Sequence, residues 1–158
     1  MPLFLNLEMS IGNTKLDKML DRGERLSDLE AWYRTFTPTV KNKIIKWIQE
    51  DQLTNQGIGA DGEVIGYYSY TTELISGGEK QEGDPYTLDD TGAFYQSMFV
   101  VILKDAVVTE ADPIKGNDNL FEKYGQNIIG LTEGNIVKLQ EILKISYIEY
   151  IKETLLRA

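Results

Sequence analysis

The residues best suited to chemistry lie in the segment "TLDDTGAFYQSM" (87–98). Asp89 and Asp90 are adjacent carboxylates, and Thr91 and Gly92 follow them in a turn-forming sequence. A carboxylate on a tight turn can perform hydrolysis when a second carboxylate is held against it, because the pair shares one proton and activates a water molecule. A chain with a single Asp-Thr-Gly triplet would obtain the second carboxylate only by dimerising. Asp90 is therefore the candidate for acid–base catalysis in this segment.

The surroundings of Asp90 weaken this catalytic interpretation. Asp-Thr-Gly-Ala is the tetrapeptide of aspartic peptidases, in which it follows a buried apolar strand, and "NIIG" (127–130) imitates the element before the C-terminal helix of retroviral-type peptidases. Here the preceding residues, "GEKQEGDPYTLD" (79–90), are polar and turn-forming. The interval between the two motifs is also too short for the sheet and the Gly-rich flap hairpin. A dimeric aspartic peptidase acting through Asp90 is therefore a remote alternative.

A structural role explains the same residues without chemistry. Asp90 or Thr91 would cap a short helix over "GAFYQSM" (92–98) by accepting a hydrogen bond from a backbone N–H two or three residues further on. The carboxylates of Asp89 and Asp90 would also stabilise the positive N-terminal end of that helix. The sequence thus predicts a turn and helix cap at Asp90, Thr91 and Gly92, and no catalytic residue.

Composition removes several other kinds of chemistry. The chain of 158 residues contains neither cysteine nor histidine. This excludes disulfides, thiol nucleophiles, Cys/His zinc sites and Ser-His-Asp triads. The formal net charge is −9, which repels nucleic-acid phosphates, and the lysines of "VKNKIIKW" (40–47) would not converge on one point of a helix. We expect no direct binding of nucleic acid and no metal.

Two glycine-rich motifs and the N-terminus also fail as functional signals. "GIGADG" (57–62) matches a dinucleotide fingerprint, but it follows a predicted helix and precedes an extended segment, the reverse of the order required. "DGEVIGYY" (61–68) and "KGNDNLFE" (115–122) offer too few oxygen ligands for a calcium loop. The N-terminus lacks the features of a signal peptide or a membrane span. We therefore expect no cofactor and no membrane.

The first third of the chain is predicted to be mainly helical. Apolar residues alternate over residues 3–9, which favours a short strand and is also compatible with a helical start. Apolar residues then recur at helical spacing from Leu16 to Tyr33. Thr37 and Pro38 form a typical helix start. The buried stripe of the helix that follows would consist of Val40, Ile44, Trp47 and Ile48.

The remaining sequence changes from turns and strands to one long helix. Within a turn-rich region, "EVIGYYSYTTELI" (63–75) favours a strand or an extended arm. "SMFVVILKDAVVTEA" (97–111) predicts two strands around a turn near Lys104-Asp105. "LTEGNIVKLQEILKISYIEYIKETLL" (131–156) predicts a long helix capped by Thr132. The order predicts an α+β fold in a single domain over residues 1–158. It would contain N-terminal helices, a small antiparallel sheet, an extended Gly/Tyr-rich arm at about 54–90 and a long C-terminal helix.

Three segments together resemble the virion-morphogenesis and tail-completion proteins of tailed bacteriophages, including those of prophages. They are "QLTNQGIGADGEVIGYYSYTTE" (52–73), "GDPYTLDDTGAFYQSMFV" (83–100) and "FEKYGQNIIGLTEGNIVKLQEIL" (121–143). Gly59 and Tyr70 depart from the pattern, where an acidic residue and a proline are more usual. The resemblance covers roughly residues 44–145, and the matching positions are Gln56, Gly57, Ile58, Asp61, Gly62, Ile65, Gly66, Tyr68, Ser69, Leu88, Asp90, Thr91, Gly92, Phe94, Ser97, Gly130, Leu131 and Thr132.

The resemblance implies a non-enzymatic protein at the junction of the phage head and tail. Such proteins often form a ring of identical subunits and contact neighbouring neck, tail and portal proteins. They are located in the virion, and in the host cytoplasm during assembly. The alternative in another class is a cytosolic adaptor that binds a protein partner through the Tyr-rich arm.

Two sequence features agree with a ring subunit, which needs apolar surface beyond its own core. The stripe of the C-terminal helix is wider than one core surface requires, since Ile142, Ile145, Ile148 and Leu155 extend it. The Gly/Tyr-rich segment would order against a neighbour. Alternatively, both are internal core and ordinary loop. The residues expected at a subunit interface are Tyr67, Tyr68, Tyr70, Tyr147, Tyr150 and Ile151.

Overall fold

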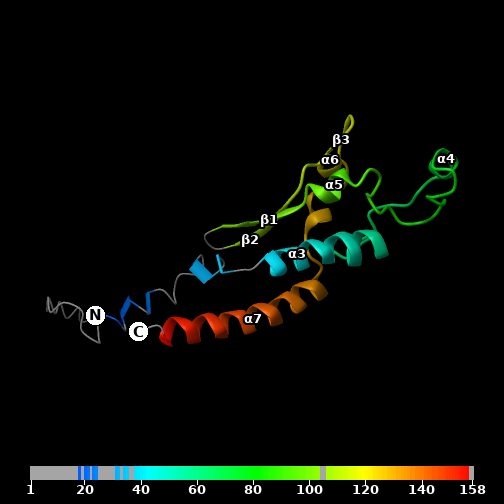
Figure 1. The fold of residues 1–158 in the computed structure, drawn as a ribbon. Coiled ribbons are helices and arrows are strands. Elements are labelled where there is room, and N and C mark those ends of the chain that lie inside the picture. Colours follow the sequence, from blue (N-terminus) through cyan, green and yellow to red (C-terminus); the bar gives the residue numbers. More distant parts are fainter. Residues whose placement is uncertain are drawn as a thin grey trace, which may run out of the picture.

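The computed structural model describes residues 38–103 and 106–156, together with residues 18, 20, 21, 23, 24, 31, 32, 34 and 35. The fold is α+β, with helices, two small antiparallel sheets and a long C-terminal helix (Figure 1). The predictions for residues 3–9, for the cap at Thr37 and for the turn at Lys104-Asp105 lie outside the described residues. The predicted helical stretch from Leu16 to Tyr33 lies mostly outside them.

The helix that supports the core begins at Pro38, as predicted. Helix α3 (Pro38–Lys46) continues directly as the π-helix η1 (Trp47–Thr54). Ile44, Ile48 and Leu53 are buried along its inner face. Gln52 is also completely buried, although it is polar. The helix therefore brings one amide side chain into an apolar core.

The predicted pair of strands is confirmed. Strands β1 (Phe99–Ile102) and β2 (Val107–Glu110) are antiparallel, with Phe99 opposite Glu110. Val100 is buried and Phe99 is exposed, as expected when successive side chains point to opposite faces. A second hairpin pairs β3 (Ile114–Lys115) with β4 (Asp118–Asn119). Within the described residues, the sheet component of the fold thus consists of two short hairpins.

Short helices complete the core between the hairpins and the C-terminal helix. They are α5 (Ala93–Gln96), α6 (Leu120–Tyr124) and the 3-10 helix η2 (Gln126–Ile129). The Asn119 side chain caps α6 by accepting hydrogen bonds from two backbone N–H groups. The buried apolar cluster consists of Ile44, Ile48, Leu53, Phe94, Met98, Val100, Leu120, Ile128 and Ile129.

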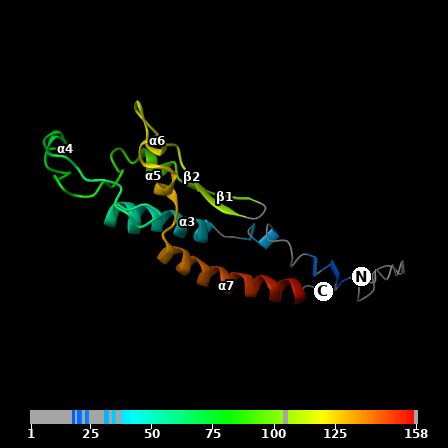
Figure 2. The same cartoon turned by 180° about the vertical axis from the view of Figure 1, so that it is seen from behind.

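The long C-terminal helix α7 (Glu133–Leu156) is confirmed. The Thr132 hydroxyl accepts a hydrogen bond from the Asn135 N–H at 3.4 Å, so Thr132 occupies the cap position. Asn135 is the buried residue of α7, and Leu139 packs against the core. Beyond that point the helix runs away from the core (Figure 2). The centre of the Tyr147 ring lies 4.9 Å from the centre of the Trp32 ring.

A long excursion of the chain, residues 57–86, forms an arm that projects from the end of η1 (Figure 1). The sequence favours a strand or an extended arm over residues 63–75, and the structure has the arm without a continuous strand. Isolated bridges join Ile58 to Val64 and Tyr67 to Pro85, and helix α4 (Tyr70–Ile75) follows. The reason is local. The Ser69 hydroxyl caps α4 by accepting from the Thr72 N–H, and this cap prevails over the β propensity of the sequence.

Candidate functional site

Asp90 lies between two lysines. Its carboxylate oxygens are 3.1 Å from Lys80 Nζ, in the arm, and 3.1 Å from Lys115 Nζ, in β3. Hydrogen bonds from Lys80 and Lys115 lower the pKa of Asp90. Asp90 therefore connects the arm to the β3–β4 hairpin.

The sequence predicts that Asp90 or Thr91 caps α5, and Asp90 does not have this role in the structure. Gly92, with φ of +76°, occupies the cap position, and no side chain caps the helix there. The positive φ of Gly92 separates Asp90 from the first turn, and the two ammonium groups attract its carboxylate instead. Thr91 retains part of the predicted role, since its hydroxyl accepts from the Ala93 N–H at 3.4 Å.

The surroundings of Asp90 do not suit a shared catalytic proton. A carboxylate that holds a proton near neutral pH needs a raised pKa, and two lysines have the opposite effect. The neighbouring phenol, Tyr95, has a pKa raised to about 12, chiefly by burial, so it remains protonated. Its hydroxyl donates to the Thr87 carbonyl. Within the described residues, no cluster of three or more acidic side chains could hold a metal ion.

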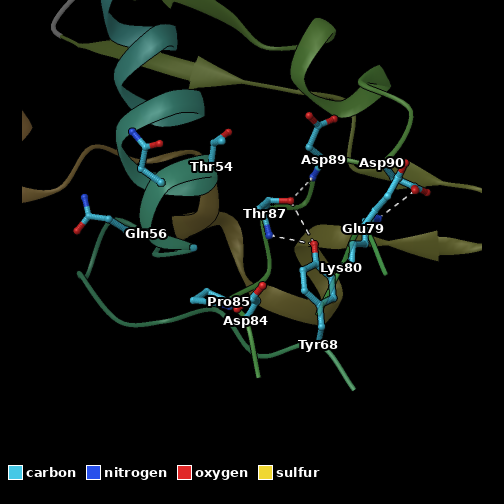
Figure 3. A pocket seen from close by; sticks show the side chains of 12 residues that line it. Thr54, Gln56, Tyr68, Glu79, Lys80, Asp84, Pro85, Thr87, Asp89 and Asp90 are labelled. Carbon is cyan, nitrogen blue, oxygen red and sulfur yellow. Dashed lines mark hydrogen bonds and ion pairs between the residues drawn. The ribbon is translucent and has the colours of Figure 1, made fainter. Parts of the chain in front are cut away.

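A hollow of about 450 Å³ lies at the base of the arm, beside the end of η1 (Figure 3). Its charged lining comprises four carboxylates against the single ammonium of Lys80. The four are Glu79, Asp84, Asp89 and Asp90. The arrangement would repel an anionic ligand and accept a basic side chain more readily.

The base of the arm is ordered by aromatic contacts. The Tyr68 and Tyr86 rings are 4.9 Å apart, and the Tyr86 and Tyr124 rings are 5.9 Å apart. The Tyr68 hydroxyl lies 3.1 Å from the Thr87 hydroxyl. Tyr68, which the sequence suggests as an interface residue, therefore belongs to the internal packing of the arm.

The other five suggested interface residues are distributed over two surfaces. Tyr67 and Tyr70 are exposed on the outer part of the arm. Tyr147, Tyr150 and Ile151 are half-buried on α7, and the Tyr147 ring contacts Trp32. Within one chain, the six residues therefore do not form one patch. The surface on the arm and the surface on α7 lie apart.

Sequence reasoning missed the most exposed apolar residues of the arm. Leu74 and Ile75, at the end of α4, are 63% and 83% exposed. An apolar pair directly before Gly77-Gly78 is the signal that could have indicated them. On α7, Ile145, Ile148 and Leu155 are exposed, although they extend the predicted stripe.

A buried polar network that joins η1 to α7 was also missed. The Gln52 side chain donates to the Gly130 carbonyl at 2.8 Å. Its oxygen accepts from the Thr132 N–H at 2.9 Å and from the Asn135 amide at 3.0 Å. Gln52 follows Ile48 by four residues, so its place on the buried face was readable from the sequence. This network sets where α7 begins.

Comparison with protein-family models, with curated proteins and with solved structures found no match for this chain. Within the described residues, no helix is both long and apolar enough to cross a membrane.

Proposed function

We propose that this chain is a structural virion protein of a tailed phage. It would be a component of the neck or head–tail connector, or a tail-completion protein. It would assemble as a ring of identical subunits. The observation that carries the proposal is a pair of exposed apolar surfaces outside the core. One is the outer part of the arm, and the other is the exposed side of α7 that carries Ile145, Ile148 and Leu155.

The two surfaces suit an assembly subunit because the core is complete without them. The buried cluster is formed by α3, η1, the short helices, η2 and β1, and contains no residue of α4. Exposed apolar patches of this kind mark sites of protein contact. A ring subunit needs two contact surfaces, because each copy has a neighbour on either side.

The segments that resemble phage tail-completion proteins support the same proposal, because they build the base of the arm. Gly57 accepts a backbone hydrogen bond from Ile65, and Gly66 accepts one from Tyr86. A Cβ at Gly66 would lie 2.4 Å from the Tyr86 ring, so the close packing there needs glycine. The resembling residues therefore position a projecting arm rather than a catalytic group.

The native mass of the purified chain, measured over a concentration series, tests self-assembly. A closed oligomer larger than a dimer is expected. A monomer at every concentration would contradict a self-assembling ring. Mass spectrometry of phage particles from the source strain tests the location, and absence of the chain from purified particles would contradict a virion protein.

The exposed aromatic side chains of the arm also favour a second candidate, a protein-binding adaptor. Tyr67 and Tyr70 are each 57% exposed, and tyrosines are frequent in protein interfaces. The adaptor would be a stable monomer that binds one defined protein. A dimer with acid-optimum proteolysis, lost in Asp90→Asn and Asp90→Ala alike, would instead support the peptidase.

A further inference from the structure

The arm ends in an apolar surface that the described part of the chain does not cover. We define the arm tip as residues 67–84, which include α4. Tyr70, Leu74 and Ile75 lie on it and are 57%, 63% and 83% exposed. Backbone hydrogen bonds between Tyr68 and Asp84, and between Gly83 and Tyr68, close the tip at its base. The tip is therefore an ordered element whose apolar side chains are exposed to solvent.

A second apolar surface, which no other described residue covers, lies on α7. We define the outer face of α7 as Ile145, Ile148 and Leu155, which are 61%, 42% and 48% exposed. Leu139, Leu143 and Tyr147 lie on a different, half-buried part of the helix. Figures 1 and 2 place α4 at one end of the molecule and the C-terminal half of α7 at the other. The two surfaces therefore cannot meet within one chain.

The charges next to the two surfaces differ: the arm tip is acidic, whereas the outer face of α7 carries charges of both signs. The arm tip has one lysine, Lys80, which is already paired with Asp90. Its acidic residues are Glu73, Glu79, Glu82 and Asp84, so four carboxylates and one ammonium give the tip a net charge of −3. On α7, Lys144 and Lys152 are exposed and lie four residues before and after Ile148, on the same side of the helix. Glu141 and Glu149 are also exposed, four residues before and after Ile145. Lysines thus border the apolar residue at the centre of the outer face, and glutamates border Ile145.

We propose that the arm tip of one copy docks on the outer face of α7 of a second copy. Leu74 and Ile75 would cover Ile148, and tip carboxylates would face Lys144 and Lys152. The contact uses a different surface on each partner, so every docked pair still has one free tip and one free outer face. Repetition of this contact gives a ring when the rotation between neighbouring copies closes on itself. The inference rests on the proposed function and specifies its interface.

Contact between two arm tips is disfavoured by the same charges. It would place the acidic residues of one tip against those of another, and like charges across an interface oppose binding. Pairing of two α7 helices would use one surface twice and would stop at a dimer. A mixing experiment separates these arrangements, because only a contact between unlike surfaces lets two different defective variants complement each other.

The test uses Ile75→Asp in the tip and Ile148→Asp on the outer face. Each variant alone is expected to be a monomer under conditions in which the wild type is an oligomer. An equimolar mixture is expected to give a heterodimer and nothing larger, because Ile75→Asp keeps an intact outer face and Ile148→Asp keeps an intact tip. Native mass spectrometry measures all three samples, and circular dichroism checks that each variant is folded.

Ile114→Asp is the matched control, because Ile114 is 60% exposed but lies on the β3–β4 hairpin. It should keep the wild-type mass. A double variant with Lys144→Glu and Lys152→Glu should assemble at least tenfold more weakly than the wild type. Mixing it with a second chain that carries Glu79→Lys and Glu82→Lys should restore assembly. Two results would overturn the docking mode but not the ring, provided that the wild type is an oligomer. In one, both aspartate variants remain oligomeric; in the other, their mixture remains monomeric. A monomeric wild type overturns the ring as well.

Discussion

At the scale of single residues, the contact between η1 and α7 depends on the hydrogen bonds of Gln52. The side chain is fully buried and makes three hydrogen bonds. Its partners are one carbonyl, one backbone N–H and one side-chain amide, none of which a hydrocarbon could replace. A buried polar group left without a partner costs about 1–3 kcal/mol. The position therefore tolerates neither a smaller nor an apolar residue.

Gln52→Leu should lower the free energy of unfolding by about 2–5 kcal/mol, because it leaves several buried polar groups unpaired. Urea denaturation followed by circular dichroism measures the change. Gln140→Leu is the control, since Gln140 is exposed on α7, and it should stay within about 0.5 kcal/mol of wild type. Equal effects of the two substitutions would show that the network contributes nothing.

Asp90 provides a prediction that distinguishes an ion pair from a helix cap. Its side chain is 47% exposed, so Asp90→Asn should cost no more than about 1 kcal/mol at neutral pH. The folded pKa lies below the ordinary value of 3.8, so the stabilisation is present above about pH 4 and disappears as pH falls through the folded pKa.

The stability difference between wild type and Asp90→Asn should therefore vanish once the pH is well below 3.8, and it should shrink in high salt. Asp89→Asn removes the neighbouring charge and serves as the control for a general charge effect. Asparagine is a good helix cap. An asparagine variant as stable as wild type at neutral pH, together with a destabilised Asp90→Ala, would restore the cap interpretation.

At the scale of elements, the parts predicted correctly are those decided by neighbouring residues. Pro38 begins α3, alternation around a turn defines β1 and β2, and a long helical stripe defines α7. Helix α4 was not predicted, because its β-branched and aromatic residues favour a strand, whereas the structure has a helix capped by the Ser69 hydroxyl. The π-helical form of η1 was not predicted either, since apolar spacing over eight residues does not distinguish it from an α-helix.

The candidate site was less predictable than the fold, because it depends on contacts distant in sequence. The partners of Asp90 lie in the arm and in β3, and no local pattern indicates them. The sequence could suggest that tyrosines of the arm lie at an interface. It could not show that Tyr68 packs inward on Tyr86 while Tyr67 and Tyr70 point outward.

The packing at the base of the arm should be disturbed by a substitution at Gly66. A Cβ there would lie 2.4 Å from the Tyr86 ring, so Gly66→Ala must displace that ring from Tyr68 and Tyr124. Overpacking of this kind costs about 1–3 kcal/mol. Hydrogen exchange should accelerate at the Tyr68, Gly83 and Tyr86 amides and remain unchanged at Ile48.

Gly134→Ala is the control for Gly66→Ala, because nothing lies within 4 Å of a Cβ at Gly134. It should stabilise α7 by about 0.5–1 kcal/mol, as expected for alanine in place of glycine within a helix. Unchanged exchange in the Gly66→Ala arm would mean that the tyrosine contacts do not order it.

At the scale of the whole molecule, the arm and the core are separable. The two chain segments that connect the arm to the core pair at Tyr67 and Pro85. Backbone hydrogen bonds also join Tyr68 to Gly83 and Asp84. Residues 69–82 contribute no member to the buried apolar cluster. The chain can therefore be closed between Tyr68 and Gly83 by a two-residue Asn-Gly turn, which suits an antiparallel pair.

The chain shortened in this way should keep its fold and lose its assembly. Its core cluster is intact, so we expect thermal unfolding within a few degrees of wild type, apart from the small loss of the Lys80–Asp90 pair. Its native mass should be that of a monomer, because the apolar arm tip is absent while the outer face of α7 remains. Added wild-type chain should bind this free face through its own tip, so the shortened chain should cap growing oligomers. Assembly of the shortened chain to the wild-type mass would show that the contact between subunits lies elsewhere.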